Sequence, residues 1–465
     1  MIRTLRTSVM AITVAAGWAL PAQAQNADNA AIQQELAAMR AQMVQMSQRI
    51  DTLQDQLAVA RSKADSAAAA VAAIPAPTPA PAAVITWDGA PRISQPVDSK
   101  NPGAGTWSFK PRGRLQVDTA GVNAPAGIPG SASLGIATEI RRAYIGAEGT
   151  IPGGFGYRAD FDLANSSVEI TDLYLTYKPN PKLTLTLGQH KAFWGLEELT
   201  SDLFTSFMER AAFNSAFGFE RRVGLSAAYA GTDVVVQGGV FADNAADLNL
   251  DTNNSYSVDG RVVFMPKLAG GQLHLGVSGH YRTFNDVSTT ARYRARPLVH
   301  TTDVRLVDTK AFSATGERSF GGEAAFISGR FHATAETHFI TALRPGLADP
   351  TFNGGYGEVG LLLTDDTTAY KGGVYDRIKP KASVGKGGIG AVQLNARYDW
   401  LDLNDAGIVG GRQQVAGVSL LWMPTDYVRF IVNYGHLWIE DAAVAAGLRR
   451  DYQADSIGMR AQLDF

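Results

Sequence analysis

The chain contains no cysteine among its 465 residues. Disulfide bridges and thiolate-bound metal sites are therefore excluded. Its net charge at pH 7 is only −2, which argues against a polycation that binds nucleic acid. After one N-terminal apolar stretch no second long hydrophobic run follows, so no transmembrane helix is expected in the rest of the chain. A long chain of this kind is either soluble or a β-barrel.

The seven histidines are scattered, and none has the spacing of a zinc site. His332 and His338, for example, stand alone in segments of alternating polarity. A serine–histidine pair on a barrel wall stays an open alternative, because outer-membrane hydrolases use that placement, but no motif marks one. We therefore expect no enzymatic activity, no catalytic residue, no cofactor and no metal site.

The N-terminus carries the three parts of a secretory signal peptide. Arg3 and Arg6 form a basic start, an apolar run extends from Val9 to Leu20, and Ala22-Gln23-Ala24 is a small-x-small cleavage pattern. The apolar run of about a dozen residues is short for a membrane-spanning helix, and a retained anchor helix is the alternative. We expect residues 1–24 to be a signal peptide.

After this leader, apolar residues recur at alternating steps of four and three. They form an a/d heptad seam: Ile32, Leu36, Met39, Met43, Met46, Ile50, Leu53, Leu57, Ala60 and Ala64. The period predicts a self-associating coiled coil over residues 25–66, with an amphipathic helix lying on other structure as the alternative. Four closely spaced prolines (75, 77, 79 and 81) then predict an extended Pro/Ala-rich linker and lead-in over residues 67–106.

From residue 107 onward, short segments alternate apolar and polar residues. About sixteen segments of about ten residues follow one another, an even number and the length of a tilted membrane strand. Short connections alternate with long ones, except at the long connection 364–387. A soluble sandwich would alternate in the same way. These features together favour an all-β fold, a sixteen-stranded antiparallel transmembrane β-barrel at residues 107–465, preceded by the α-helical coiled coil.

A barrel of about sixteen strands is too wide for side chains to fill and leaves an aqueous channel. Arg292, Arg294 and Arg296 occupy alternate positions of the stretch STTARYRARPLVHTTDVR (288–305). In an extended chain they share one side, roughly 6.7 Å apart. Each pair of neighbours repels by about 2.5 kcal/mol at an effective dielectric constant of about 20, which excludes apolar burial. The strip faces either bulk water, as a solvated loop, or the wet interior of the channel.

Five blocks of the sequence follow one another in a familiar order: IRRAYIGAEGTIPGGFGYRADFDLA (140–164), LGQHKAFWGLEELTSDLFTSFMERAAFNSAF (187–217), RYRARPLVHTTDVRLVDT (292–309), LLTDDTTAYKGGVYDRIKPK (362–381) and VQLNARYDWLDLND (392–405). Together they resemble the phosphate-selective porin O/P family. The resemblance implies homotrimeric barrels in the outer membrane of a Gram-negative cell, in contact with its lipid, with the N-terminal segment in the periplasm. It also implies that the loop containing FMERAAF (207–213) folds inward and narrows the channel.

The resemblance further implies a line of arginines that guides anions. With Arg221, which the FERRVG motif adds, the candidates for the anion pathway are Arg114, Arg141, Arg142, Arg210, Arg221, Arg292, Arg294 and Arg296. For Arg221 the alternative is a salt bridge to Glu220 or a role as an anchor at the end of a strand. The constriction loop contributes Glu198, Glu209 and Arg210.

One departure from the family pattern concerns the solute. Glu198 stands where phosphate-specific members carry a lysine, and Thr171, beside Asp172, stands where they carry an acidic residue. A glutamate in the narrow zone repels a multiply charged phosphate. We expect a passive porin for small anions, with phosphate as one candidate. The alternatives are a weakly selective porin for small polar nutrients, and a tether that contacts the cell wall through the coiled coil.

Overall fold

The computed structural model describes residues 24–72, 83–95, 105–130, 133–248, 255–285 and 289–465. The predicted signal peptide, residues 1–24, lies outside these ranges except for Ala24. The chain divides into two separate units, Met1–Ala80 and Pro81–Phe465. The described part of the first unit is helical, and the second is built mainly of strands.

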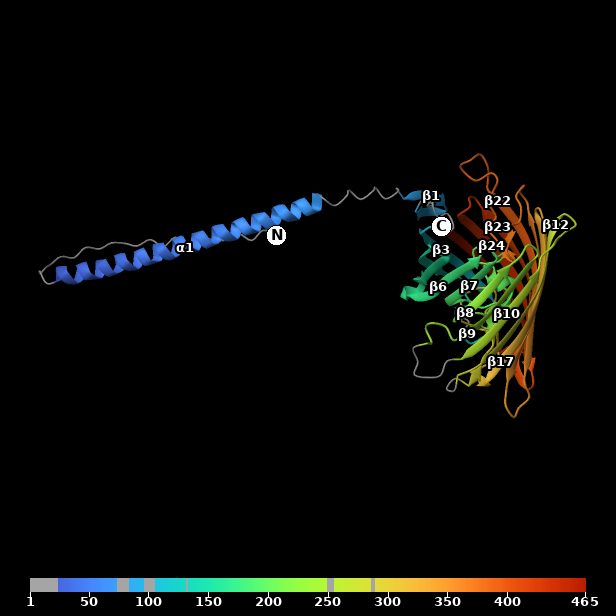
Figure 1. The fold of residues 1–465 in the computed structure, drawn as a ribbon. Helices are drawn as coiled ribbons and strands as arrows, with labels where there is room; N and C mark the ends of the chain where they lie inside the picture. Colours follow the sequence, from blue (N-terminus) through green and yellow to red (C-terminus); the bar gives the residue numbers. More distant parts are fainter. Residues whose placement is uncertain (1–23, 73–82, 96–104, 131–132, 249–254, 286–288) are drawn as a thin grey trace. The chain divides into compact units, whose positions relative to one another are not determined.

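A single helix, α1 (Ala24–Ala72), makes up the described part of the first unit (Figure 1). It confirms that the heptad region is helical. The heptad residues Met43 and Leu53 are 63% and 58% exposed, so self-association through this seam stays a prediction. Within the described residues, no helix has both the length and the apolar character needed to cross a membrane.

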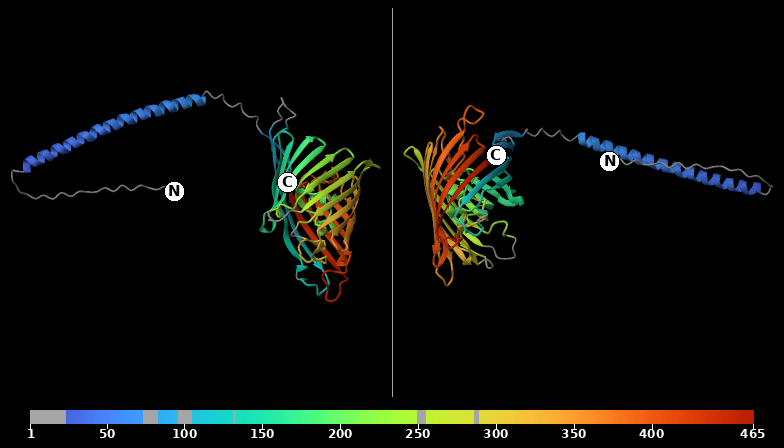
Figure 2. Two further views of the ribbon diagram at one scale, coloured as in Figure 1. Left: turned by 60° about the horizontal axis from the view of Figure 1, so that its bottom comes forward. Right: turned by 180° about the vertical axis from the view of Figure 1, so that it is seen from behind.

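The second unit is a closed barrel of sixteen antiparallel strands, which confirms the predicted fold (Figures 1 and 2). The strands are β3 (Ser108–Asn123), β4 (Ala137–Ile151), β5 (Phe155–Asp162), β6 (Glu169–Asn180), β7 (Leu183–Lys191), β8 (Arg221–Ala230), β9 (Val234–Phe241), β10 (Tyr256–Phe264), β12 (Gly271–Thr283), β17 (Gly316–Ser328), β18 (Phe331–Leu343), β19 (Thr351–Leu362), β22 (Ala391–Asp405), β23 (Ile408–Met423), β24 (Val428–Glu440) and β25 (Tyr452–Asp464). Each pairs with the next, and β25 pairs with β3, for example at Ser456 and Val122. The closure leaves no unpaired strand edge in the barrel wall.

Side chains alternate between the two faces of the wall. On β25 the polar residues Arg460 and Gln462 are buried, whereas the neighbouring Met459 and Leu463 are exposed. A water-soluble sandwich would have the opposite polarity, with its polar face outside. The exposed apolar face and the enclosed polar face are those of a barrel in lipid.

The connections differ between the two ends of the barrel. At one end, here the turn end, most strands are joined by a few residues, such as 152–154, 329–330 and 424–427. At the other, the loop end, the connections 192–220 and 284–315 are long. Short elements lie in the connections: η3 (Ala164–Ser166), α2 (Leu196–Leu199), α3 (Ala212–Ala216), β11 (Lys267–Leu268), β13 (Thr290–Ala291), β14 (Arg294–Ala295), β15 (Val307–Asp308), β16 (Phe312–Ser313), β20 (Tyr370–Lys371) and β21 (Val374–Tyr375).

Two further strands precede the barrel, in a region where only a linker and lead-in were expected. β1 (Val84–Asp88) and β2 (Ala90–Ser94) form an antiparallel hairpin, and β2 pairs with the start of β3. The turn is at Asp88-Gly89, and Gly89 has a φ of +75°. An Asp-Gly pair between two extended runs is a strong hairpin signal, so this element was readable in the sequence.

Candidate functional site

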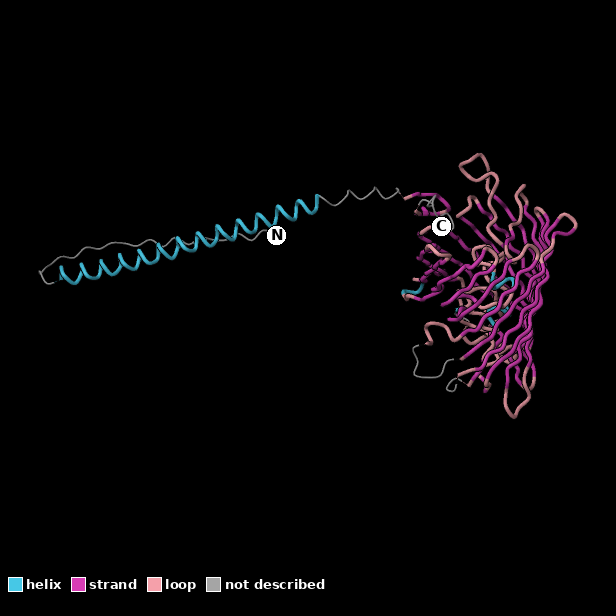
Figure 3. The backbone as a smooth tube through the Cα atoms, viewed as in Figure 1, coloured by secondary structure: helices cyan, strands magenta, loops and turns pink. Residues whose placement is uncertain are grey.

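The loop of residues 192–220, here the inner loop, crosses the interior of the barrel. It leaves the wall between β7 and β8, yet its backbone binds side chains of β18, β22, β24 and β25: Glu336, Asp399, Arg429 and Arg460. For example, Arg460 Nη1 donates to the carbonyl oxygen of Met208 at 2.6 Å. Figure 3 shows short helical turns in cyan within the outline of the magenta strands. The inner loop therefore covers the inside of the far wall.

A second connection enters the barrel from the turn end. Residues 363–390, here the basic segment, join β19 to β22 and contain the long connection 364–387 that departs from the alternation of short and long connections. The hydroxyl of Tyr370 lies 2.6 Å from His274 Nδ1, and Arg261 Nη2 donates to the carbonyl oxygen of Gly373 at 2.9 Å. Arg377 also binds Asp464. The basic segment thus packs on the inside of β10, β12 and β25.

These two segments leave one side of the interior open, along β3 to β8. A cavity of about 1220 Å³ lies there and reaches the turn end, where Gly154 and Tyr427 line it. Eleven lysines and arginines line this larger cavity, against seven aspartates and glutamates. The larger cavity therefore has an excess of positive charge, although the chain as a whole is slightly acidic.

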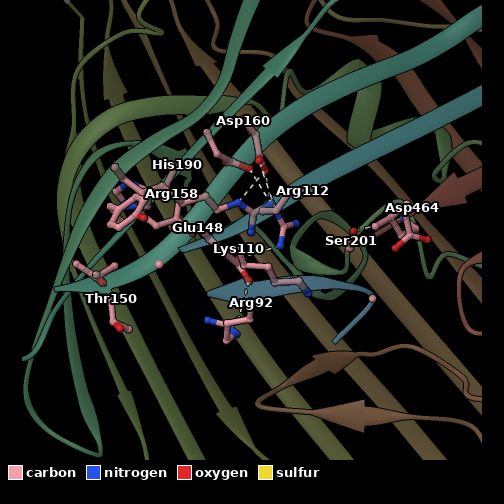
Figure 4. A pocket seen from close by; sticks show the side chains of 18 of the residues that line it. Arg92, Lys110, Arg112, Glu148, Thr150, Arg158, Asp160, His190, Ser201 and Asp464 are labelled. Carbon is pink, nitrogen blue, oxygen red and sulfur yellow. Dashed lines mark hydrogen bonds and ion pairs between the residues drawn. The ribbon is translucent and has the colours of Figure 1, made fainter. Parts of the chain in front are cut away.

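The basic residues of β3 form the most regular part of this lining. Lys110, Arg112 and Arg114 occupy alternate positions and line the larger cavity. Figure 4 shows Lys110 and Arg112. Arg112 Nη1 lies 2.7 Å from Glu148. Of the three, the sequence analysis named only Arg114. The signal for the other two was the alternation of FKPRGR (109–114), the same spacing that identified the arginine strip at 292–296.

A smaller cavity of about 190 Å³ lies on the other side of the inner loop, towards the loop end. Four of the predicted pathway arginines line it together with two acids of the inner loop: Arg141, Arg142, Arg210, Arg296, Glu198 and Glu209. Arg141 Nε donates to Glu209 at 3.1 Å. The structure therefore brings these residues around one space.

Ion pairs lie between the two cavities. Asp202, which lines the larger cavity, accepts from Arg114 Nη1 at 2.6 Å and lies 3.1 Å from Nε of Arg142, which lines the smaller one. Beside this pair, Glu198 lies 3.1 Å from Lys191 and 3.4 Å from Arg210. All of these side chains are at most about one-sixth exposed. Carboxylates thus lie among the cations between the two cavities.

Arg210 holds the backbone of the inner loop as well as facing the smaller cavity. Its guanidinium donates to the carbonyl oxygens of Glu197 and Thr200, both at 2.9 Å. A third bond, of 3.3 Å, reaches the carbonyl oxygen of Glu198. Much of the donor capacity of Arg210 is therefore used within the inner loop.

The structure separates the three arginines at 292–296. Arg296 lines the smaller cavity and binds Asp303 at 2.9 Å, whereas Arg292 and Arg294 line neither cavity. Arg292 Nε donates to Asp308 at 2.9 Å. Burial acts to raise the pKa of Asp308, but hydrogen bonds from Arg292 and the Lys310 backbone prevail and lower it to about 2.

Arg305 lies close to two arginines of the strip, Arg294 and Arg296. Burial, followed by the charges of Arg296 and Arg294, lowers the pKa of Arg305 to about 10.

The other predicted residues lie on the barrel wall. Arg221 lines the larger cavity and donates to Asp172 at 2.8 Å, rather than to Glu220. Arg222 is the residue near Glu220, at 3.5 Å. Thr171, beside Asp172, donates its hydroxyl to the carbonyl oxygen of Asp160. Asp172 and Asp160 both line the larger cavity, so acidic groups also accompany the cations there.

Comparison with known proteins shows which proteins the chain is similar to in sequence and in fold. Residues 109–465 match the family model described as "Phosphate-selective porin O and P". An uncharacterized protein of Caulobacter vibrioides is 41% identical over 458 residues, covering 94% of this chain and 90% of that protein. Porin O of Pseudomonas aeruginosa is 27% identical over 373 residues, which cover 70% of this chain and 82% of that protein.

Two solved structures share the fold at low identity. An anion-selective porin from Comamonas acidovorans has a TM-score of 0.51 and 12% identity, covering 77% of this chain and 100% of that one. OmpT, an outer membrane protein of Vibrio cholerae, has a TM-score of 0.51 and 10% identity, and the match covers 77% of this chain and 98% of that one.

Proposed function

This chain belongs to the phosphate-selective porin O and P family of outer-membrane porins, and we propose that it is a passive channel for small anions. The observation that carries the proposal is the excess of cations around the larger cavity, on the side of the barrel that the inner loop and the basic segment leave open. Charge that lines a confined aqueous path concentrates counter-ions there. Guanidinium groups also offer paired donors that match the oxygens of carboxylates and phosphates.

In this proposal an anion passes from the smaller cavity to the larger one. The inner loop narrows the path, and the pairs of Asp202 with Arg114 and Arg142 form its bottleneck. Arg141, Arg210 and Arg296 attract anions on the loop-end side, and the β3 cations with Arg221 do so on the turn-end side. A chain of shallow sites lets an ion enter and still leave.

The acids of the bottleneck support a preference for small anions of low charge over strict phosphate specificity. Glu198 and Asp202 repel a multiply charged phosphate more strongly than a monovalent anion, because Coulomb energy scales with the charge of the ion. Lys191 and Arg210 offset the charge of Glu198 in part. Phosphate remains one candidate solute among small anions.

We further propose that the protein assembles as a homotrimer. The exposed heptad residues of α1 support self-association, because apolar side chains at a and d positions are buried between helices in a coiled coil. The alternative role of α1, contact with the cell wall, belongs to the tether hypothesis.

Planar-bilayer recording of the purified full chain tests the proposal. A salt gradient across the bilayer gives a reversal potential whose sign reports anion or cation preference. We expect a stepwise current and a reversal potential of anionic sign. A reversal potential near zero would favour the weakly selective porin, and a folded protein that carries no current would favour the tether.

A further inference from the structure

The hairpin β1–β2 is attached to the turn end of the barrel rather than lying free as a linker. Ile93 and Ser94 pair with Phe109 and Ser108 of β3, and the amide of Gln95 donates to the carbonyl oxygen of Trp107 at 3.1 Å. The hairpin therefore extends the sheet at the edge where β3 begins.

The tip of the hairpin contacts a second point on the rim. A Cβ atom added to Gly89 would lie 2.8 Å from Cε1 of Tyr427, so the backbone of the tip packs closely on that ring. The neighbouring Ala90 is only 1% exposed. Tyr427 belongs to the turn before β24, and β3 and β24 flank β25 on its two sides. The hairpin thus extends over the rim from β3 to the turn before β24.

The hairpin also contributes a cation to the larger cavity. Gly89 and Arg92 both line that cavity. Arg92 Nη2 lies 3.6 Å from Glu148, the carboxylate that also binds Arg112 at 2.7 Å. In Figure 4, Arg92 lies below Lys110, and Arg112 lies farther along β3. Arg92 therefore adds a cation from β2 beside the row of β3 cations, near the turn end.

From these contacts we propose that the hairpin is part of the channel mouth at the turn end, and that Arg92 is one of the cations of the anion path at that mouth. This inference rests on the proposed function. By the rule that short turns face the periplasm, the hairpin lies at the periplasmic mouth. It captures small anions at that side and raises their concentration next to Lys110 and Arg112.

The absence of cysteine makes a chemical test possible in the full chain. In the variant Arg92→Cys, a methanethiosulfonate reagent that carries a trimethylammonium group restores a positive charge at position 92, and one that carries a sulfonate adds a negative charge. Each reagent is added to the open channel in a planar bilayer. Mass spectrometry of the same preparation shows that labelling is complete.

We expect Arg92→Cys to lower anion conductance about two- to three-fold at about 0.01 M salt, where the Debye length is about 30 Å, and to have little effect at about 1 M salt, where it is about 3 Å. The cationic reagent restores the conductance, and the anionic reagent lowers it further. A merely structural role would not follow the sign of the attached charge.

The matched control is Arg412→Cys on β23. Arg412 is also an ion-paired, partly exposed arginine, bound to Asp402 at 2.8 Å, but it lines neither cavity. Its labelling should leave conductance unchanged with either reagent. If complete labelling at position 92 likewise leaves low-salt conductance and reversal potential unchanged while the unmodified channel is anion-selective, the hairpin is not part of the path. An unmodified channel without anion preference would instead overturn the proposed function itself.

Discussion

Neutralising Asp202 should make the channel more selective for anions. In the wild type, Asp202 lies between Arg114 and Arg142 at distances of 2.6 and 3.1 Å, so the three groups carry a net charge of +1. Asp202→Asn keeps the shape of the side chain and one oxygen acceptor. It raises the local net charge to +2, because both guanidiniums stay protonated.

The size of the effect follows from Coulomb's law. An anion about 5 Å from the carboxylate is repelled by about 0.8 kcal/mol at the dielectric constant of water and by about 3.3 kcal/mol at an effective value of about 20. A cation at the same place is attracted by the same amount. If the smaller energy, about 0.8 kcal/mol, is removed for both the anion and the cation, the anion-to-cation permeability ratio changes by on the order of tenfold.

The assay is the reversal potential of single variants in an asymmetric salt gradient. Conductance alone is less informative, because a site that binds an anion more tightly also releases it more slowly. The control is Asp172→Asn, which also removes an acid from between two arginines, Arg221 at 2.8 Å and Arg158 at 3.4 Å. Asp172 and both of its arginine partners line the larger cavity, whereas Asp202 joins arginines of the two cavities, so the control should shift the ratio less than about threefold.

The reasoning would be refuted by a folded Asp202→Asn channel whose permeability ratio stays within about twofold of the wild type. Retained mobility of the unheated band on a denaturing gel shows that the barrel is folded. An equal shift of the permeability ratio in Asp172→Asn would also contradict the proposal that Asp202 lies at a bottleneck. It would show that acids elsewhere in the barrel interior affect ion selectivity as strongly.

Three further predictions concern the loop end and the inner loop. Glu198→Lys should raise permeability to phosphate relative to chloride, measured as bi-ionic reversal potentials, because it replaces a negative charge by a positive one and so raises the net charge of the bottleneck by two; a lower phosphate ratio would contradict this. Arg296→Ser should lower low-salt anion conductance, whereas Arg294→Ser, outside both cavities, should change it by less than about a fifth; equal effects would show that the strip acts as one unit. Arg460→Met should destabilise the barrel by about 3–5 kcal/mol in urea unfolding, because it leaves the buried Asp118 without its partner at 2.7 Å; unchanged stability would mean that Asp118 finds another donor or a proton.

The barrel wall could be predicted because the information for it is local. In SIGMRAQLDF (456–465) the alternation alone separates Met459 and Leu463, which face outward, from Arg460 and Gln462, which face inward. Each strand must present an apolar face to lipid and bond its backbone to both neighbours. The alternation of side chains, the length of the segments and their even number therefore all predict a transmembrane β-barrel.

The interior could be predicted only in part, because side chains there have partners far away in the sequence. The basic segment has the composition of a solvated turn, and its position inside the barrel depends on His274 and Asp464, which belong to other strands. Arg210 was expected to act mainly as a charge at the constriction. It also bonds three backbone carbonyls of the inner loop, so Arg210→Ser would disturb the loop as well as the charge.

Two strips with the same spacing show why a pattern of charges does not identify a pathway by itself. Lys110, Arg112 and Arg114 alternate on β3, and the arginines at 292–296 alternate in a loop. Spacing determines only that three side chains share a face. For β3, pairing with β4 and β25 over most of its length forces that face inward, since the other face meets lipid. In the loop, β14 pairs with β15 over two residues, so the wall does not dictate its orientation. The pathway should therefore be sought first among alternating cations on strands of the barrel, and the neutralisation of Arg112 should lower low-salt anion conductance more than that of Arg294.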